Sequence, residues 1–268
     1  MKIDLHNHSN YSDGLYSVEE LIKIAKKNKI DVMALTDHDS TYGCNEAIEY
    51  GKKYGVKVIA GLELSTVYKG ESVHIIGLFK QNNIPNEIRN IAADIKGYRK
   101  QRAINMMNNI KNIYGVNIDV LEFVQNKDVI TRGNMFNYII KHNPNLTKEE
   151  VSSFISNKSP AYIEAAKFST KDGIDFLKRN NCITIYAHPT LSPKEIVEDV
   201  IKFGVDGIEF NYPKNKIGDK KRFKNLAKKY NLLLSAGSDF HGDINHANIG
   251  TSTLDEKLWN KILEALKW

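Results

Sequence analysis

The sequence predicts an α/β fold, in which crossover helices join a barrel-like parallel sheet of seven strands. Short apolar runs rich in β-branched residues alternate with helix-like segments over most of the 268 residues. Histidines and carboxylates follow most of these runs, and in such barrels functional side chains gather at the C-terminal ends of the strands. One long segment breaks the alternation and predicts an insertion between the fourth and fifth strands.

The order of the elements follows from these runs. The seven expected strands are residues 3–5, 32–35, 56–59, 73–79, 183–186, 207–210 and 232–235. The expected helices between them are residues 17–27, 42–54, 170–179, 193–203 and 216–230. Ser17 and Glu20, three residues apart and next to an apolar run, form the capping-box signature that predicts the start of the first helix.

The segment 81–168 is too long for a simple crossover between neighbouring strands. Its pattern is mostly helical, with candidate helices at 88–113, 133–141 and 147–155. We therefore expect two domains: a barrel made of 1–80 and 169–268, and a helical cap made of 81–168.

The composition is that of an ordinary globular protein, with 41% hydrophobic and 26% charged residues. No apolar stretch approaches the about 20 residues of a membrane helix, and the first residues form a motif rather than a signal peptide. The two cysteines provide no disulfide framework, which predicts free thiols in the reducing cytoplasm. The net charge of +6 comes mostly from scattered lysines, which is typical of solvated helix faces and compatible with anionic substrates.

Most of the histidines lie at the ends of apolar runs, together with carboxylates. The motifs are His6-x-His8, Asp37-His38, Gly61-x-Glu63, Val73-His74, Ala187-His188 and Asp239-x-His241. Two histidines two positions apart on a strand project from the same face and can chelate one ion. Imidazole and carboxylate without thiolate suit Zn, Mn or Fe(II). Because the donors outnumber what one ion can use, we expect a multinuclear centre in which Glu63 can bridge two ions.

Such a centre has a definite chemistry. It can convert bound water to hydroxide near neutral pH and hold the oxygens of an in-line displacement at phosphorus. Three divalent ions set against Asp13, Glu63 and Asp239 would leave a positive charge that attracts a phosphate dianion. No P-loop is present in the sequence, and this chemistry requires no Ser, Cys or Asp nucleophile.

The donors also occur in a characteristic order: His6-x-His8, Asp13, Thr36-Asp37-His38, Gly61-x-Glu63, His74, His188 and Asp239-x-His241. This order resembles the polymerase-and-histidinol-phosphatase (PHP) family of metallophosphoesterases, over 1–80 and 169–268. The resemblance implies a distorted seven-stranded β/α barrel, usually with a trinuclear metal site. It implies the following ligand sets: His6, His8, Glu63 and Asp239 for a first ion, Glu63, His74 and His188 for a second, and Asp13, His38 and His241 for a third.

Local motifs resemble one branch of that family. They are Gly61-Leu62-Glu63-Leu64-Ser65, Val73-His74-Ile75-Ile76-Gly77, Ala187-His188-Pro189 and Pro160-Ala161-Tyr162. The branch acts on nucleotides, which implies hydrolysis of phosphomonoesters such as AMP or 3′,5′-bisphosphonucleotides, with short RNA trimmed from its 5′ end as a further option. The alternative enzyme is histidinol-phosphate phosphatase, and the alternative of another class is a non-catalytic, metal-stabilised module. Neither a membrane nor an obligate protein partner is implied.

Four of the six arginines lie in the insertion, namely Arg89, Arg99, Arg102 and Arg132. Because Arg is a good bidentate partner for phosphate, we expect Arg99, Arg102 and Arg132 to bind the phosphate of the substrate. Arg99 and Arg102 would share a helix face, although a surface salt bridge is an alternative role for them. Arg132 stands ahead of a helix whose N-terminus is itself an anion site, and the resemblance implies a phosphate-binding arginine there.

Catalytic roles are expected for Asp13, Glu63 and His241, with His241 able to supply a proton to the leaving alkoxide. The roles of three other carboxylates stay open. Asp37 and Asp39 could orient His38 or cap a helix, and Glu209 could point into the site or cap the sheet. The remaining two histidines, His142 and His246, are expected on the surface.

Overall fold

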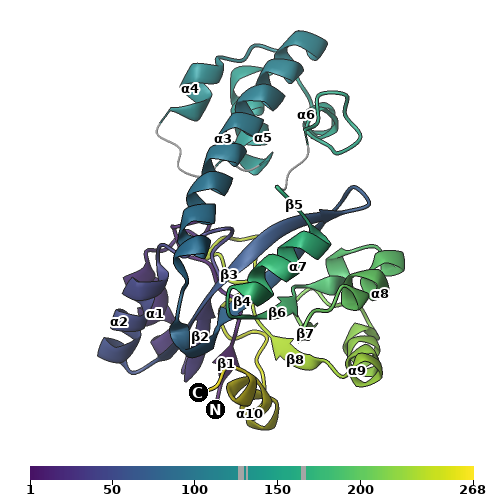
Figure 1. Cartoon of the computed structure of the whole chain (residues 1–268). Coiled ribbons are helices and arrows are strands. Elements are labelled where there is room, and N and C mark those ends of the chain that lie inside the picture. The colour runs from purple at the N-terminus through teal and green to yellow at the C-terminus, as the bar shows by residue number, and fades with distance from the viewer. Residues whose placement is uncertain (126–129, 131, 164–166) are drawn as a thin grey trace. The chain divides into compact units, whose positions relative to one another are not determined.

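The computed structural model describes residues 1–125, 130, 132–163 and 167–268. The chain divides into two compact units, one formed by Met1–Ala92 with Phe168–Trp268 and the other by Ala93–Lys167. Figure 1 labels the helices and strands of both units, and each unit is described by itself.

The first unit is built on a sheet whose main path runs through seven strands in the order β1-β2-β3-β4-β6-β7-β8. These strands are β1 Ile3–Asp4, β2 Val32–Leu35, β3 Lys57–Tyr68, β4 Glu71–Phe79, β6 Cys182–Tyr186, β7 Gly207–Asn211 and β8 Leu233–Ala236. A short strand, β5 Phe168–Ser169, pairs with β3 beside this path. The backbone N–H of Leu5 donates to the carbonyl of Ala236 at 3.0 Å, so the first and last strands meet and the predicted seven-stranded barrel is confirmed.

One feature of this sheet differs from the parallel barrel that the sequence predicts. Strand β3 turns directly into β4 through Lys69 and Gly70, which both have positive φ, and the two strands pair antiparallel. Strand β4 also runs antiparallel to β6. A two-residue turn leaves no length for the crossover that parallel neighbours need, so the expectation of an all-parallel sheet was wrong at β4.

Helices surround the barrel strands in the expected alternation. They are α1 Val18–Lys27, α2 Cys44–Tyr54, α7 Thr170–Arg179, α8 Lys194–Lys202, α9 Asp219–Tyr230 and α10 Glu256–Ala265. Ser17 and Glu20 form the predicted capping box at the start of α1, and α1 buries Leu21 and Ile22 in a shared apolar cluster. The last helix, α10, follows β8 and was not among the expected elements.

The helices of the inserted segment have a core of their own. They are α3 Asn86–Tyr114, α4 Val120–Val124, α5 Arg132–His142 and α6 Lys148–Phe154, and the division between the two units falls within α3. Met106, Ile110, Phe123 and Ile139 are fully buried in one cluster of this second unit. Three of these helices match the expected ones, whereas the short helix α4 was not expected.

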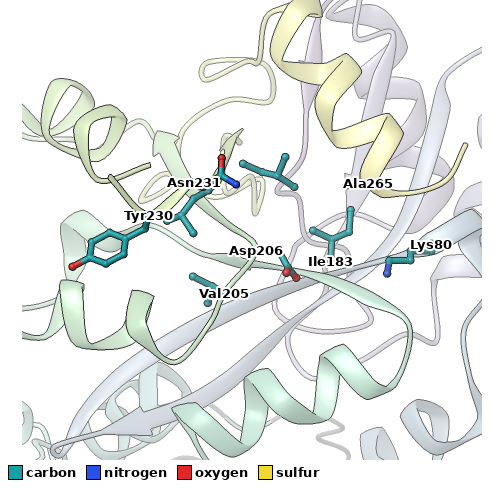
Figure 2. Close-up of a pocket in the computed structure, with 9 residues that line it drawn as sticks. Lys80, Ile183, Val205, Asp206, Tyr230, Asn231 and Ala265 are labelled. Carbon is teal, nitrogen blue, oxygen red and sulfur yellow. The ribbon is translucent and has the colours of Figure 1, made fainter. Parts of the chain in front are cut away.

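A pocket lies near the N-terminal ends of β6, β7 and β8 (Figure 2). None of its lining residues belongs to the predicted metal ligands. Asp206 lines it and accepts hydrogen bonds of 2.9 Å from both the backbone N–H and the hydroxyl of Thr184. This carboxylate therefore joins the middle of β6 to the residue that precedes β7. Within the described part of the chain, no helix is both long and apolar enough to cross a membrane.

Candidate metal centre

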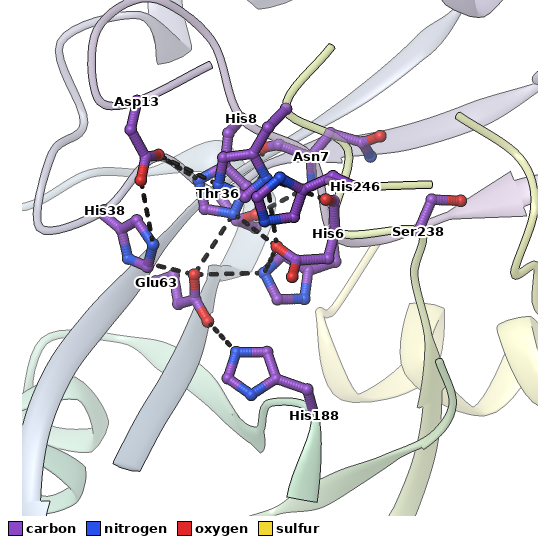
Figure 3. Close-up of polar contacts among 12 residues, drawn as sticks. His6, Asn7, His8, Asp13, Thr36, His38, Glu63, His188, Ser238 and His246 are labelled. Atoms are coloured by element: carbon purple, nitrogen blue, oxygen red, sulfur yellow. Dashed lines mark hydrogen bonds and ion pairs between the residues drawn. The ribbon is translucent and has the colours of Figure 1, made fainter. Parts of the chain in front are cut away.

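Imidazoles and carboxylates from most of the barrel strands, and from the loops that follow them, form a cluster (Figure 3). His6 and His8 follow β1, His38 follows β2, and His188 follows β6. The remaining members of the cluster are Asp13 from the loop before α1, Glu63 within β3, His74 within β4, and Asp239 and His241 after β8. The structure thus brings all nine predicted ligands into contact with at least one other predicted ligand.

Glu63 lies at the middle of this cluster and is fully buried. Its Oε2 approaches ring nitrogens of three histidines at 3.2–3.3 Å: His6, His8 and His38. Its Oε1 lies 3.1 Å from Nδ1 of His74 and 2.8 Å from Nε2 of His188. One carboxylate therefore presents its two oxygens to two different groups of histidines, which is the arrangement that a bridging ligand requires.

The first predicted ligand set forms a compact group. Donor atoms of His6, His8, Glu63 and Asp239 all lie within 4.8 Å of one another, and all four residues are buried. Oδ1 of Asp239 lies 3.3 Å from Nε2 of both His6 and His8. These atoms could hold one cation in the space between them.

Two further groups differ slightly from the predicted sets. His8 joins Asp13, His38 and His241 in a group whose donors lie within 4.8 Å, with Nε2 of His241 only 3.1 Å from Oδ1 of Asp13. A further group contains Glu63 with His38 and His74. Oε1 of Glu63 contacts His74 and His188, and its Oε2 contacts His38. His8 and His38 therefore each take part in two groups.

The cluster contains buried polar atoms that make no hydrogen bond. Among the described residues these include Nε2 of His6, both ring nitrogens of His8, Nδ1 of His38 and Oε2 of Glu63. Buried polar atoms without a partner are costly and rare. Divalent cations between these atoms would satisfy them, and neutral imidazole with carboxylate is a donor set that fits Zn, Mn or Fe(II). The residues present therefore fit a multinuclear metal site.

Electrostatics in the cluster are unusual for buried groups. Burial disfavours the charged ring of His8, but the carboxylates of Asp239 and Glu63, each 3.3 Å from its Nε2, outweigh this and raise the pKa to about 10. Burial likewise opposes ionisation of Glu63, yet the surrounding histidines hold its pKa well below the usual range. In His38, burial dominates and lowers the pKa to about 3. Protons on rings such as that of His8 must leave when a cation binds.

The loop that carries His8 and Asp13 is held by Asp37. This buried carboxylate accepts hydrogen bonds of 2.7 Å from the backbone N–H and the hydroxyl of Ser9 and from the hydroxyl of Ser12. The helix-cap alternative for Asp37 and Asp39 is wrong, because Gly43 occupies the N-cap of α2. Asp39 instead accepts a hydrogen bond of 2.7 Å from the backbone N–H of Ser65.

Three residues beside the cluster were missed or left open by the sequence reasoning. Tyr212 donates its hydroxyl to Oδ2 of Asp239 at 3.1 Å. Glu209 contacts His6 at 3.2 Å, so it points into the site and does not cap the sheet. His246, expected on the surface, is partly buried and stacks on His241 with ring centroids 3.9 Å apart. Nδ1 of His246 also lies 2.8 Å from Oδ1 of Asp243. The three-residue spacing of Asp243 and His246 was the feature of the sequence that could have indicated this contact.

The predicted phosphate-binding arginines all lie in the second unit. Arg102 is buried, donates from Nε to the carbonyl of Ile163 at 2.8 Å, and has its guanidinium 5.5 Å from the ring centroid of Tyr162. The surface salt bridge considered for Arg102 is therefore wrong. Arg99 is partly exposed, and Arg132 is exposed at the first position of α5. Phosphate binding by these three arginines stays a prediction.

A barrel that gathers imidazoles and carboxylates at one end, with buried donors left unpaired, belongs to the class of metal-binding α/β-barrel proteins. The PHP domain family matches residues 4–268, and the chain belongs to this family. The family expected from the order of the motifs is thereby confirmed.

Proteins of known activity are similar to this chain over most of their length. A phosphoribosyl 1,2-cyclic phosphate 1,2-diphosphodiesterase of Eggerthella lenta is 27% identical over 89% of this chain and 94% of its own. A 5′-3′ exoribonuclease of Haemophilus influenzae is 27% identical over 90% of both chains. A 3′,5′-nucleoside bisphosphate phosphatase of Chromobacterium violaceum is 28% identical over 89% of this chain and 87% of its own.

Proposed function

We propose that this protein is a metal-dependent phosphoesterase that hydrolyses phosphomonoesters of nucleotides, of the AMP or 3′,5′-bisphosphonucleotide type, with the 5′ ends of short RNA as a further option. The predicted class, hydrolysis of phosphoesters, is confirmed by the family and by the activities for which its relatives are named. The observation that carries the proposal is the position of Glu63, whose two oxygens contact five histidines.

The proposed cofactors are two or three divalent ions, of Mn, Zn or Fe. The first would be held by His6, His8, Glu63 and Asp239, the second by Glu63, His74 and His188, and the third by Asp13, His38 and His241. Such ions lower the pKa of a coordinated water and offset the negative charge on phosphate oxygens during displacement.

The chain's own groups would orient the reaction and handle the proton. Nδ1 of His241 donates to the carbonyl of Asp239 at 2.9 Å, so its Nε2 faces Oδ1 of Asp13. If only the first two ions are bound and this pair is free of metal, a proton on Nε2 can be passed to a leaving alkoxide. Glu63 would fix the spacing of the two groups of histidines, and Arg99, Arg102 and Arg132 would bind phosphate.

The proposal is tested by a panel of substrates assayed with Mn²⁺. We expect turnover of AMP, 3′,5′-bisphosphoadenosine or a short 5′-phosphorylated RNA to exceed that of histidinol phosphate. Phosphoribosyl 1,2-cyclic phosphate belongs in the panel because of the relative from Eggerthella lenta. Greater turnover of histidinol phosphate would favour the alternative phosphatase. Absence of all turnover in a metal-loaded protein would favour a non-catalytic module.

The same assay needs an inactive variant, so that turnover at this centre can be told apart from turnover by a contaminating phosphatase. Asp13→Asn removes the carboxylate that faces His241 while leaving the buried barrel core untouched. We expect its turnover to be lost in a folded protein. Turnover equal to that of the unchanged chain would contradict the proposed mechanism. We also propose that the protein acts in the cytoplasm, where its buried thiols Cys44 and Cys182 remain free.

A further inference from the structure

Glu209 is a carboxylate inside the barrel for which the proposed reaction has no role. It lies in the middle of β7 and is fully buried. Side chains alternate along a strand, so Glu209 lies on the opposite face of β7 from Ile208 and Phe210. The pairing of β7 with β8 shifts register between Glu209 and Asn211, and such bulges redirect side chains beside active sites.

The two oxygens of Glu209 contact two different predicted metal ligands. Oε1 lies 3.2 Å from Nδ1 of His6, and Oε2 accepts the backbone N–H of His188 at 2.7 Å. His6 follows β1 and His188 follows β6, so one carboxylate on β7 joins the ends of two other strands. Carboxylates beside metal sites orient a ligating histidine by accepting a hydrogen bond from its ring. Glu209 contacts two predicted ligands in place of one.

The contact with His6 sets which ring nitrogen is available. Carboxylate oxygens accept hydrogen bonds, so this contact favours the tautomer of His6 that carries hydrogen on Nδ1. Nε2 then presents its lone pair toward Oε2 of Glu63 and Oδ1 of Asp239, each 3.3 Å away. A ring with the opposite tautomer would direct an N–H into the proposed ion site.

The contact with His188 supports an unfavourable backbone. His188 has φ of 28° and ψ of 57°, a region that residues with a side chain occupy only where their surroundings hold them. The hydrogen bond from its N–H to Glu209 stabilises this conformation at the point where the chain leaves β6. In this conformation Nε2 of His188 lies 2.8 Å from Oε1 of Glu63.

Gly237 completes the arrangement around this carboxylate. A Cβ at position 237 would lie 2.2 Å from Cβ of His6 and 2.9 Å from Oε1 of Glu209. Only a residue without a side chain leaves room for the two groups to meet there. The contact between His6 and Glu209 is thus enclosed by the chain that follows β8.

We propose that Glu209 is a positioning residue of the metal centre, which sets the tautomer of His6 and the backbone of His188 so that both face Glu63. This inference rests on the proposed metal centre, but not on which ester is hydrolysed. Loss of a group that orients a metal ligand weakens metal binding by about 10–100-fold. We expect Glu209→Gln, which keeps the size but loses one acceptor, to bind Mn²⁺ more weakly within that range.

The experiment is titration of the metal-free protein with Mn²⁺ by calorimetry, together with thermal unfolding without metal. Asp206→Asn is the matched control, since Asp206 also joins β6 to β7, through Thr184, but contacts none of the predicted metal ligands. We expect the control to lower the unfolding temperature and leave Mn²⁺ affinity unchanged. Glu209→Gln with unchanged Mn²⁺ affinity, or with a loss no larger than that of the control, would overturn the proposal.

A second measurement uses the unchanged protein, so it does not depend on whether a variant folds. In the Zn²⁺-loaded unchanged protein, ¹⁵N shifts of the histidine rings report which nitrogen carries hydrogen. We expect His6 to carry it on Nδ1, and hydrogen on Nε2 would overturn the proposal. Because neither readout uses an ester, weaker Mn²⁺ binding by Glu209→Gln in a protein that hydrolyses no ester would support this inference and contradict the proposed function.

Discussion

Tyr212 donates a hydrogen bond to Oδ2 of Asp239 over 3.1 Å. The other oxygen of the same carboxylate, Oδ1, lies 3.3 Å from Nε2 of both His6 and His8. Burial raises the pKa of the Tyr212 hydroxyl well above its usual value, so the hydroxyl keeps its proton. The tyrosine thus holds one oxygen of Asp239 and leaves the other for the proposed ion.

Removing this hydroxyl should weaken the first ion site. We predict that Tyr212→Phe binds Mn²⁺ about 10-fold more weakly, because Asp239 loses the partner that fixes its orientation. Titration of the metal-free variant with Mn²⁺ measures the change. Tyr138→Phe is the control, because Tyr138 donates to Glu122 at 2.9 Å inside the second unit. An equal effect in both variants would contradict a specific role for Tyr212.

Loss of the charge on Glu63 should weaken metal binding more than loss of the Tyr212 hydroxyl does. We predict that Glu63→Gln retains fewer ions per chain. We also predict that its turnover falls by more than about 100-fold, the largest loss expected when a residue that only orients a ligand is removed. Ion content by mass spectrometry and steady-state kinetics measure both effects. Glu46→Gln, which alters a carboxylate bonded to the exposed Tyr11, should match the unchanged protein. Normal ion content in Glu63→Gln would refute the bridging role.

The metal-free protein should become less stable as the pH rises above neutrality. Burial disfavours charge on His8, but Asp239 and Glu63 raise its folded pKa to about 10, whereas an unfolded histidine titrates near about 6.5. The stabilisation from this proton is complete below the unfolded pKa and is lost as the pH approaches the folded value. Thermal unfolding of metal-free protein across this range should show a falling midpoint.

Two comparisons check whether His8 causes this fall of the unfolding midpoint with rising pH. His8→Asn should make it shallower, because the proton responsible is no longer present. Saturating Mn²⁺ should also oppose the fall, since the cation takes the place of the proton and binds better as the pH rises. A midpoint that rises with pH in the metal-free protein would contradict the assignment.

The proposed role of Arg132 in binding the phosphate of the substrate can be tested by substitution. Arg132 is exposed at the start of α5, so Arg132→Ala should fold normally. We predict that it raises KM for a nucleotide about 10-fold with little change in kcat, as expected when an interaction common to ground and transition states is lost. Arg179→Ala alters an arginine paired with Glu87 on the surface and is the control. Unchanged KM in Arg132→Ala would remove Arg132 from the proposed site.

The cluster of ligands could be predicted because the relevant residues follow apolar runs, and strands of a barrel end together. Tyr212 could not, since a tyrosine after a buried strand matches no ligand spacing, and for Glu209 the sequence left open whether it points into the site or caps the sheet. Their roles depend on contacts with Asp239, His6 and His188, which come from distant parts of the chain. Only the closed barrel brings these contacts together.

The antiparallel pair of β3 and β4 escaped prediction for a different reason. Lys69-Gly70 is a weaker hairpin signal than Asn-Gly or Asp-Gly. Strand β3 is also buried on both faces along most of its twelve residues, so no alternation marks its length. The expected strand at 56–59 was therefore too short.

That hairpin also bears on how the centre assembles. His74 and Glu63 are only eleven residues apart in sequence and are held on adjacent strands by a continuous ladder of pairs. The contacts of Asp239 with His6 and His8 join the two ends of the chain and require the barrel to close. Contacts of short sequence separation cost less chain entropy, so the contact of His74 with Glu63 can form first in folding. The contacts of His188 and Asp239 with the centre join distant parts of the chain and are completed later.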